Sequence, residues 1–105
     1  MITPTAMKLI EERGNLCECC GIRQGTEAHH ALYYKDNKNL RAKKLLDMTY
    51  NLILVCERCH SCKAKTHQSK VRFWEIQCAR YGHDVMVAWH NKIPYKQENK
   101  VLEYK

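Results

Sequence analysis

The stretch NLILVCERCHSCKAK, residues 51–65, carries an apolar run directly into two cysteines that are two residues apart. Asn51 to Val55 is rich in leucine and β-branched residues, which predicts a short buried strand. Cys56 and Cys59 have the spacing of a metal-binding knuckle, because a two-residue gap lets both thiolates face one ion. His60 follows the second cysteine at once, and Asn51 stands nine positions before it. The stretch therefore combines a metal knuckle with two polar residues that the knuckle does not need.

A second knuckle with the same spacing, Cys17 and Cys20, comes earlier in the chain. Two such pairs complete the tetrahedral sulfur shell that zinc accepts, so the sequence predicts a structural zinc held by four cysteines. Cys19 and Cys62 adjoin the knuckles and are alternative ligands, whereas Cys78 falls on an apolar helical face and is expected in the core. Buried free thiols are the other interpretation, which the paired spacing disfavours. A four-thiolate site has no open position, so any chemistry must come from elsewhere.

Composition indicates one small, basic, reduced domain. The 105 residues include 18 Lys and Arg against 11 acids, for a formal net charge of +7, and seven cysteines. A positive balance of this size favours a polyanionic partner. The opening MITPTAMKLIEERG lacks the apolar core of a signal peptide, and no segment approaches a membrane span. We therefore expect a cytoplasmic protein without a membrane partner, whose cysteines bind metal rather than form disulfides.

Helical patterns flank the two knuckles. Residues 4–13 predict a short helix that Gly14 ends, and residues 68–81 carry apolar side chains at helical spacing before Gly82. Asp84 is a candidate cap for a last helix that ends before Pro94.

The part of the insert over residues 33–47 is polar and strongly basic, and predicts a loop or a short helix. No repeat or linker interrupts the chain. We expect a single α+β domain over residues 1–105, with a core of about 15–67 and a helical extension of about 68–94.

The segment between the knuckles begins with a doubled histidine, His29 and His30, in the stretch EAHHALYY and ends at Asn51. A zinc that joins the knuckles would draw these histidines toward Asn51 and His60. Adjacent residues on a strand point to opposite faces, so the two histidines need not play the same part. A β-bulge would bring both toward one site.

Taken together, C-x-x-C, then HH, then N-L-x-x-x-C-x-x-C-H-x-x-K resembles the zinc-containing HNH endonucleases over roughly residues 15–67. The resemblance implies a ββα-metal core, treble-clef-like and stapled by the zinc, that cuts phosphodiester bonds. It implies that His30 is the general base for the attacking water and that Asn51 orients it through a hydrogen bond. It also implies that His29 and His60 bind a catalytic divalent ion.

The chemistry of these residue types agrees with those roles. A histidine titrates near neutral pH, so it can be unprotonated and accept a proton. An ion at the scissile phosphate offsets charge on the leaving oxygen. Asn37 and Asn39 compete with Asn51 for the middle role, but neither leads into the second knuckle.

The chain departs from the common HNH pattern in two places. Ala31-Leu32-Tyr33 replaces the Ile-x-Pro turn of many members, and His29 stands where many carry aspartate. Two imidazoles without an obvious carboxylate suit Mn²⁺, Ni²⁺ or Co²⁺ better than Mg²⁺, with Zn²⁺ as a further candidate.

Basic residues beside these histidines predict contacts with DNA phosphates, which give affinity without sequence choice. The expected contacts are Lys35, Lys38, Arg41, Lys43, Lys44, Lys63 and Lys65. His67 is a further candidate for a phosphate contact or a spare ligand, and a solvated helix end is the alternative. We expect weak sequence preference or a preference for DNA structure, a monomer or homodimer, and a bacterial or phage source, with RNA as an alternative substrate.

The main rival is a non-catalytic zinc module that binds nucleic acid. It shares the cysteines and the basic insert but gives no reason for His29, His30, Asn51 and His60 to stand as they do. A protein-interaction domain of the RING kind is a further rival, which the charge of +7 disfavours.

Overall fold

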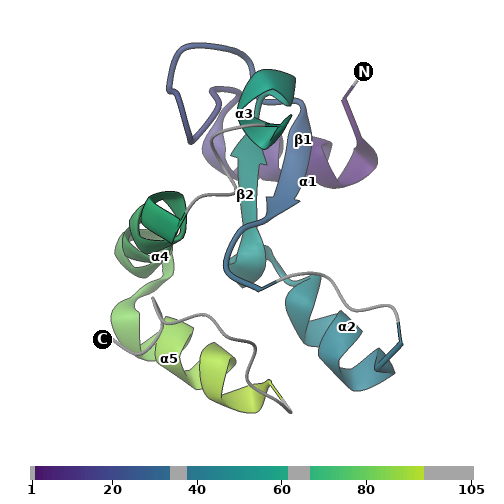
Figure 1. Ribbon diagram of the computed structural model, residues 1–105, viewed down its shortest axis with the longest axis vertical. Helices are drawn as coiled ribbons and strands as arrows, with labels where there is room; N and C mark the ends of the chain where they lie inside the picture. The colour runs from purple at the N-terminus through teal and green to yellow at the C-terminus, as the bar shows by residue number, and fades with distance from the viewer. Residues whose placement is uncertain (1, 34–37, 62–66, 94–105) are drawn as a thin grey trace.

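Two antiparallel strands link the helices of this small α+β structure, a computed structural model that describes residues 2–33, 38–61 and 67–93 (Figure 1). The described part contains five α-helices and one 3₁₀ turn. In chain order the elements are α1 (Pro4–Arg13), β1 (Glu27–His30), α2 (Leu40–Leu46), the 3₁₀ turn (Thr49–Asn51), β2 (Leu52–Val55), α3 (Glu57–Ser61), α4 (His67–Tyr81) and α5 (His83–Lys92). The predicted residues Lys35, Cys62, Lys63 and Lys65 lie outside the described residues, as does the side chain of His67.

Helix α1 has the bounds that the sequence predicted. Thr3 caps its start, because the Thr3 hydroxyl accepts a hydrogen bond from the Ala6 amide at 3.2 Å. Gly14 ends it at φ 90°, a backbone conformation that side chains disfavour. The helix buries Ala6 and Leu9 against β2. It therefore covers one face of the two-stranded sheet.

The strands pair in regular register, with His29 opposite Ile53 and His30 opposite Leu52. The bulge that would turn both histidines to one side is therefore not formed. Leu52 packs with α1, whereas Ile53 belongs to the larger core that includes Phe73 of α4. Successive side chains alternate between the two faces. His29 consequently faces α4, and His30 faces the side that α1 covers.

The basic insert contains a helix, α2, rather than a loop alone. Asn39 caps it, because its Oδ1 accepts a hydrogen bond from the Ala42 amide at 3.1 Å. Ala42 and Leu46 are buried, and the Trp89 indole donates to the Leu45 carbonyl at 2.9 Å. The insert is thereby tied to α5 near the end of the described chain.

Helices α4 and α5 follow the predicted pattern closely. Helix α4 begins one residue before the predicted 68–81 and buries Phe73, Trp74 and Gln77. The prediction that Asp84 caps α5 is wrong: Gly82, at φ 103°, is the cap, and Asp84 lies in the first turn. The helix begins two residues earlier than expected because a glycine at positive φ already turns the chain.

A buried ion-pair network joins α1, the first knuckle and β2. Arg13 donates to Glu18 at 3.1 Å and to the Leu52 carbonyl at 2.7 Å, and its side chain is only 3% exposed. Glu18 also accepts from the Leu54 amide at 2.7 Å and pairs with Arg80 of α4. Because breaking a buried pair strands a charge, this network fixes how the helices dock on the sheet.

Candidate functional site

Four cysteine sulfurs meet at the junction of the two knuckles, as the sequence predicted. The Sγ atoms of Cys17, Cys20, Cys56 and Cys59 all lie within 4.8 Å of one another. A tetrahedral zinc with Zn–S bonds of about 2.3 Å has sulfur–sulfur edges of roughly 3.8 Å. The donor set and its spacing therefore fit a structural metal ion such as zinc.

Backbone geometry organises each knuckle around its first sulfur. The Cys20 amide donates to Cys17 Sγ at 3.4 Å, and the Cys59 amide donates to Cys56 Sγ at 3.5 Å. Hydrogen bonds from the Arg23 and Ile22 amides lower the pKa of Cys20 to about 6, whereas burial raises the pKa of Cys59 well above its usual range. A bound cation would offset that burial, because thiolate ligands are deprotonated by the metal.

The remaining described cysteines lie outside this cluster. Cys19 is buried beside it, and its carbonyl accepts a hydrogen bond from Arg72 at 3.0 Å. Cys78 packs, half-buried, against the core, where the sequence placed it. The four predicted ligands thus suffice without either of them.

His29 of β1 and His60 of α3 lie close together, next to the second knuckle. Their ring centroids are 5.1 Å apart at an interplanar angle of 66°. His29 is buried and packs edge-on to Phe73, while His60 is half-buried. Two imidazoles that ligate one ion through bonds of about 2.1 Å have centroids roughly 5 Å apart. The two predicted ligands are therefore close enough to share an ion.

A carboxylate lies at this pair, contrary to the expectation that none would. Glu27 Oε1 is 3.2 Å from His60 Nδ1. The signal was in the sequence: Glu27 stands two residues before His29, and residues two apart on a strand share a face. A carboxylate on Nδ1 fixes the ring and leaves Nε2 for an ion. Among the described residues, however, the four cysteines are the one cluster with three or more ligand atoms in mutual reach.

Asn51 does not hold the His30 ring, so that prediction is wrong. Its side chain is fully buried, and Oδ1 accepts from the Leu32 and Tyr33 amides at 3.0 and 2.9 Å. Its Nδ2 donates to the Tyr33 and Leu46 carbonyls, both at 2.9 Å. Those four bonds use the whole capacity of the amide. Asn51 thus fixes the backbone that follows His30 and joins it to α2.

His30 lies on the opposite face of the sheet from His29 and His60. Its Nε2 is 2.9 Å from Asp47 Oδ1, at a surface cavity of about 340 Å³ that Thr3 and Thr5 also line. Burial opposes ionisation of Asp47, but hydrogen bonds from Lys43 and His30 lower its pKa overall. Strand alternation is the reason for this placement, and the structure does not bring the predicted base to the predicted ion ligands.

The described basic residues of the insert gather at α2. Lys38, Arg41 and Lys44 are exposed, whereas Lys43 pairs with Asp47 at 2.6 Å. Arg41 and Lys44 border a hollow of about 450 Å³ that Lys92 of α5 also lines. Lys92 is thus a basic neighbour that the sequence did not assign to this surface.

Comparison of the chain with protein-family models, with curated proteins and with solved structures finds no match. Among the described residues, no helix has both the length and the apolar character needed to cross a membrane.

Proposed function

We propose that this protein is a metal-dependent DNA endonuclease similar to the HNH enzymes, which hydrolyses phosphodiester bonds on a scaffold stapled by zinc. The observation that carries the proposal is the meeting of His29 and His60, whose ring centroids lie 5.1 Å apart although 30 residues separate them along the chain. A zinc-binding module that only holds structure has no need of a pair of imidazoles in addition to its four cysteines.

Each residue of the pair has a defined part in this proposal. His29 and His60 hold a divalent ion, which supplies charge stabilisation at the scissile phosphate when bound. Glu27 keeps the His60 ring in the orientation that presents Nε2. Lys38, Arg41 and Lys44 contact DNA phosphates without reading sequence. The four cysteines stay structural, because their shell is closed.

His30 is the residue on which the catalytic part depends most. It is the last residue of β1, and its side chain is 26% exposed, so the ring has room to move. Accepting a proton from water at the His29 and His60 pair requires this ring to leave Asp47 and turn around the strand end. Asn51 fixes the backbone just after His30, so the His30 ring would turn about that fixed point.

The contact between His30 and Asp47 favours a second candidate, a non-catalytic zinc module that binds nucleic acid. In that case the ring stays on the α1 face, where Asp47 holds it at 2.9 Å. The basic surface at α2 would serve both candidates equally.

Plasmid nicking separates the two candidates. Zinc-loaded wild type, His30→Ala and the control His83→Ala, an exposed histidine at the start of α5, are compared in Mn²⁺, Ni²⁺, Co²⁺ and Mg²⁺, with DNA binding measured on the same samples. We expect wild type and His83→Ala to nick and His30→Ala to bind without nicking.

Binding without nicking by wild type in every ion would select the adaptor. Nicking by His30→Ala at the wild-type rate would leave an endonuclease with a different base. Two imidazole ligands predict better activity in Mn²⁺, Ni²⁺ or Co²⁺ than in Mg²⁺. The highest activity in Mg²⁺ would contradict that prediction.

A further inference from the structure

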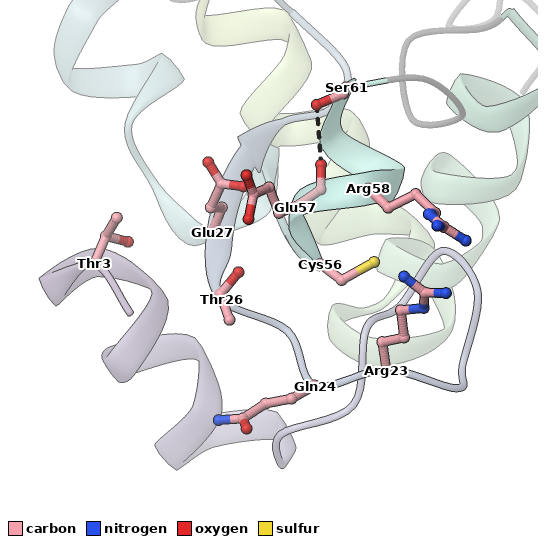
Figure 2. Close-up of a pocket in the computed structure, with 9 residues that line it drawn as sticks. All are labelled: Thr3, Arg23, Gln24, Thr26, Glu27, Cys56, Glu57, Arg58 and Ser61. Atoms are coloured by element: carbon pink, nitrogen blue, oxygen red, sulfur yellow. Dashed lines mark hydrogen bonds between the residues drawn. The ribbon is translucent and has the colours of Figure 1, made fainter. Parts of the chain in front are cut away.

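An open groove of about 740 Å³ runs along β1 and α3 next to the second knuckle (Figure 2). Its lining is divided by charge. Arg23 and Arg58 point toward one another at one end, while the carboxylates of Glu27 and Glu57 lie together away from them (Figure 2). Neither arginine is among the basic residues that the sequence predicts to contact DNA.

The two arginines are exposed and form no ion pair with the described residues, although two acids line the same groove. Two cations that face each other repel, and an anion between them adds two attractions that outweigh this repulsion. The planar guanidinium fork donates two parallel hydrogen bonds to the oxygens of a phosphate. This end of the groove is therefore suited to one phosphate group.

The cysteine cluster fixes the backbone of both arginines. The Arg23 carbonyl accepts a hydrogen bond from the Cys17 amide at 2.8 Å, so Arg23 belongs to the turn of the first knuckle. Arg58 lies between Cys56 and Cys59 in the second knuckle. Since the four sulfurs lie within 4.8 Å of one another, a metal there locks the two arginines in relation to each other. The backbones of both arginines therefore lose little conformational freedom when an anion binds, so the entropy cost falls on the two side chains.

We propose that Arg23 and Arg58 together clamp one phosphate of a nucleic-acid backbone. The inference deepens the proposed function and rests on it for the identity of the polyanion. The net charge of +7 supports a polyanion, and the groove is continuous with the proposed ion site, because Glu27 both lines it and contacts His60. The two carboxylates disfavour a phosphate at their own end, so the clamp sets the position of the strand relative to His60.

Salt-dependent DNA binding tests this clamp. Anisotropy of a labelled duplex is measured with zinc-loaded wild type, Arg23→Gln, Arg58→Gln and the double variant over a range of salt concentrations. Lys8→Gln, on the exposed side of α1 and outside the groove, is the matched control. Zinc content and far-ultraviolet circular dichroism confirm that each variant keeps its fold.

One shared phosphate predicts that the double variant lowers the slope of log K against log salt by about 0.9. The affinity of the double variant at low salt should fall about tenfold. Each single variant should lose more than half of the binding free energy that the double variant loses. Lys8→Gln should match wild type. A double variant that also matches wild type would overturn the clamp, and additive single effects with a slope change of about 1.8 would overturn the shared phosphate.

Plasmid nicking on the same samples separates this inference from the proposed function. Wild type that nicks, together with a double variant of unchanged affinity and salt slope, removes the clamp and leaves the endonuclease. A clear loss in the double variant, together with wild type that binds but does not nick, keeps the clamp and removes the endonuclease. Wild type that binds no nucleic acid overturns both.

Discussion

The neighbouring histidines His29 and His30 lie on opposite faces of the small sheet and have different contacts there. On the α4 face, His29 meets His60 at 5.1 Å between ring centroids, with Glu27 in contact with His60. On the α1 face, His30 binds Asp47 and has no second imidazole beside it among the described residues. One peptide bond separates the two histidines, and strand alternation separates their surroundings. Two adjacent histidines in a sequence therefore need not belong to the same site.

The four-cysteine cluster joins the two knuckles and belongs to the larger core, so its loss should have the largest effect. Cys56→Ser removes a ligand from a candidate zinc site, and zinc contributes about 10 to 16 kcal/mol in small zinc domains, which is comparable with the total stability of an ordinary domain. We expect a chain without bound zinc and without a cooperative unfolding transition, checked by metal analysis and circular dichroism.

Cys78→Ser is the matched control, because that half-buried thiol lies outside the cluster. It should keep one zinc per chain and unfold cooperatively. Cooperative folding of Cys56→Ser without metal would contradict a fold that depends on a metal between the two knuckles.

Asn51 should have the next largest effect, because it holds the point where β1 leaves the sheet. Asn51→Ala strands two buried amides and two buried carbonyls, which we expect to cost about 3 to 5 kcal/mol of unfolding free energy. Asn39→Ala, in the same insert, removes a helix cap and should cost about 1 kcal/mol. Urea unfolding of both variants checks the difference, and equal losses would contradict the role of Asn51.

The divalent ion proposed at His29 and His60 should depend on the histidines of one face of the sheet only. Calorimetry with Mn²⁺ on zinc-loaded protein should show one further site in wild type. His60→Ala should weaken that site at least tenfold by removing a ligand, and His30→Ala should leave it nearly unchanged because its ring faces away. A loss in His30→Ala as large as that in His60→Ala would show that both histidines reach the ion and would erase the contrast between the faces.

The smallest effect should come from Asp47 and its contacts with Lys43 and His30. Because the fold lowers the pKa of Asp47 below 3.8, its stabilising contribution is present above that value and is lost as the pH falls through the lower folded-state pKa. The carboxylate is 40% exposed, so solvent screening limits the contribution to a few tenths of a kcal/mol. Urea midpoints of wild type should approach those of Asp47→Asn at low pH, and parallel curves would contradict the assignment.

The parts of the fold that follow from local pattern were predictable from the sequence. The paired cysteine spacing identified the cluster, and helical periodicity placed α1 and α4 to within one residue. Closure of the cluster also brought His29 to His60 as expected. These features depend on short-range geometry or on one strong constraint.

The parts that depend on how distant segments dock were not predictable. The sequence predicts the amide of Asn51 on a histidine ring, but that amide binds the backbone of Leu32, Tyr33 and Leu46. The pairing of Glu18 with Arg80 joins residues 62 positions apart that carry no shared pattern. Glu27 could have been found from its place two residues before His29 on the same strand.

In the proposed function, His29 and His60 would hold a divalent ion that supplies charge stabilisation at the scissile phosphate. Single-turnover nicking of supercoiled plasmid in Mn²⁺ by zinc-loaded wild type and His60→Ala, at matched DNA occupancy, tests it most directly. We expect nicking by wild type and a loss of at least a hundredfold in His60→Ala, about 2.7 kcal/mol of transition-state stabilisation. Equal rates for the two proteins, or no nicking by either, would contradict it.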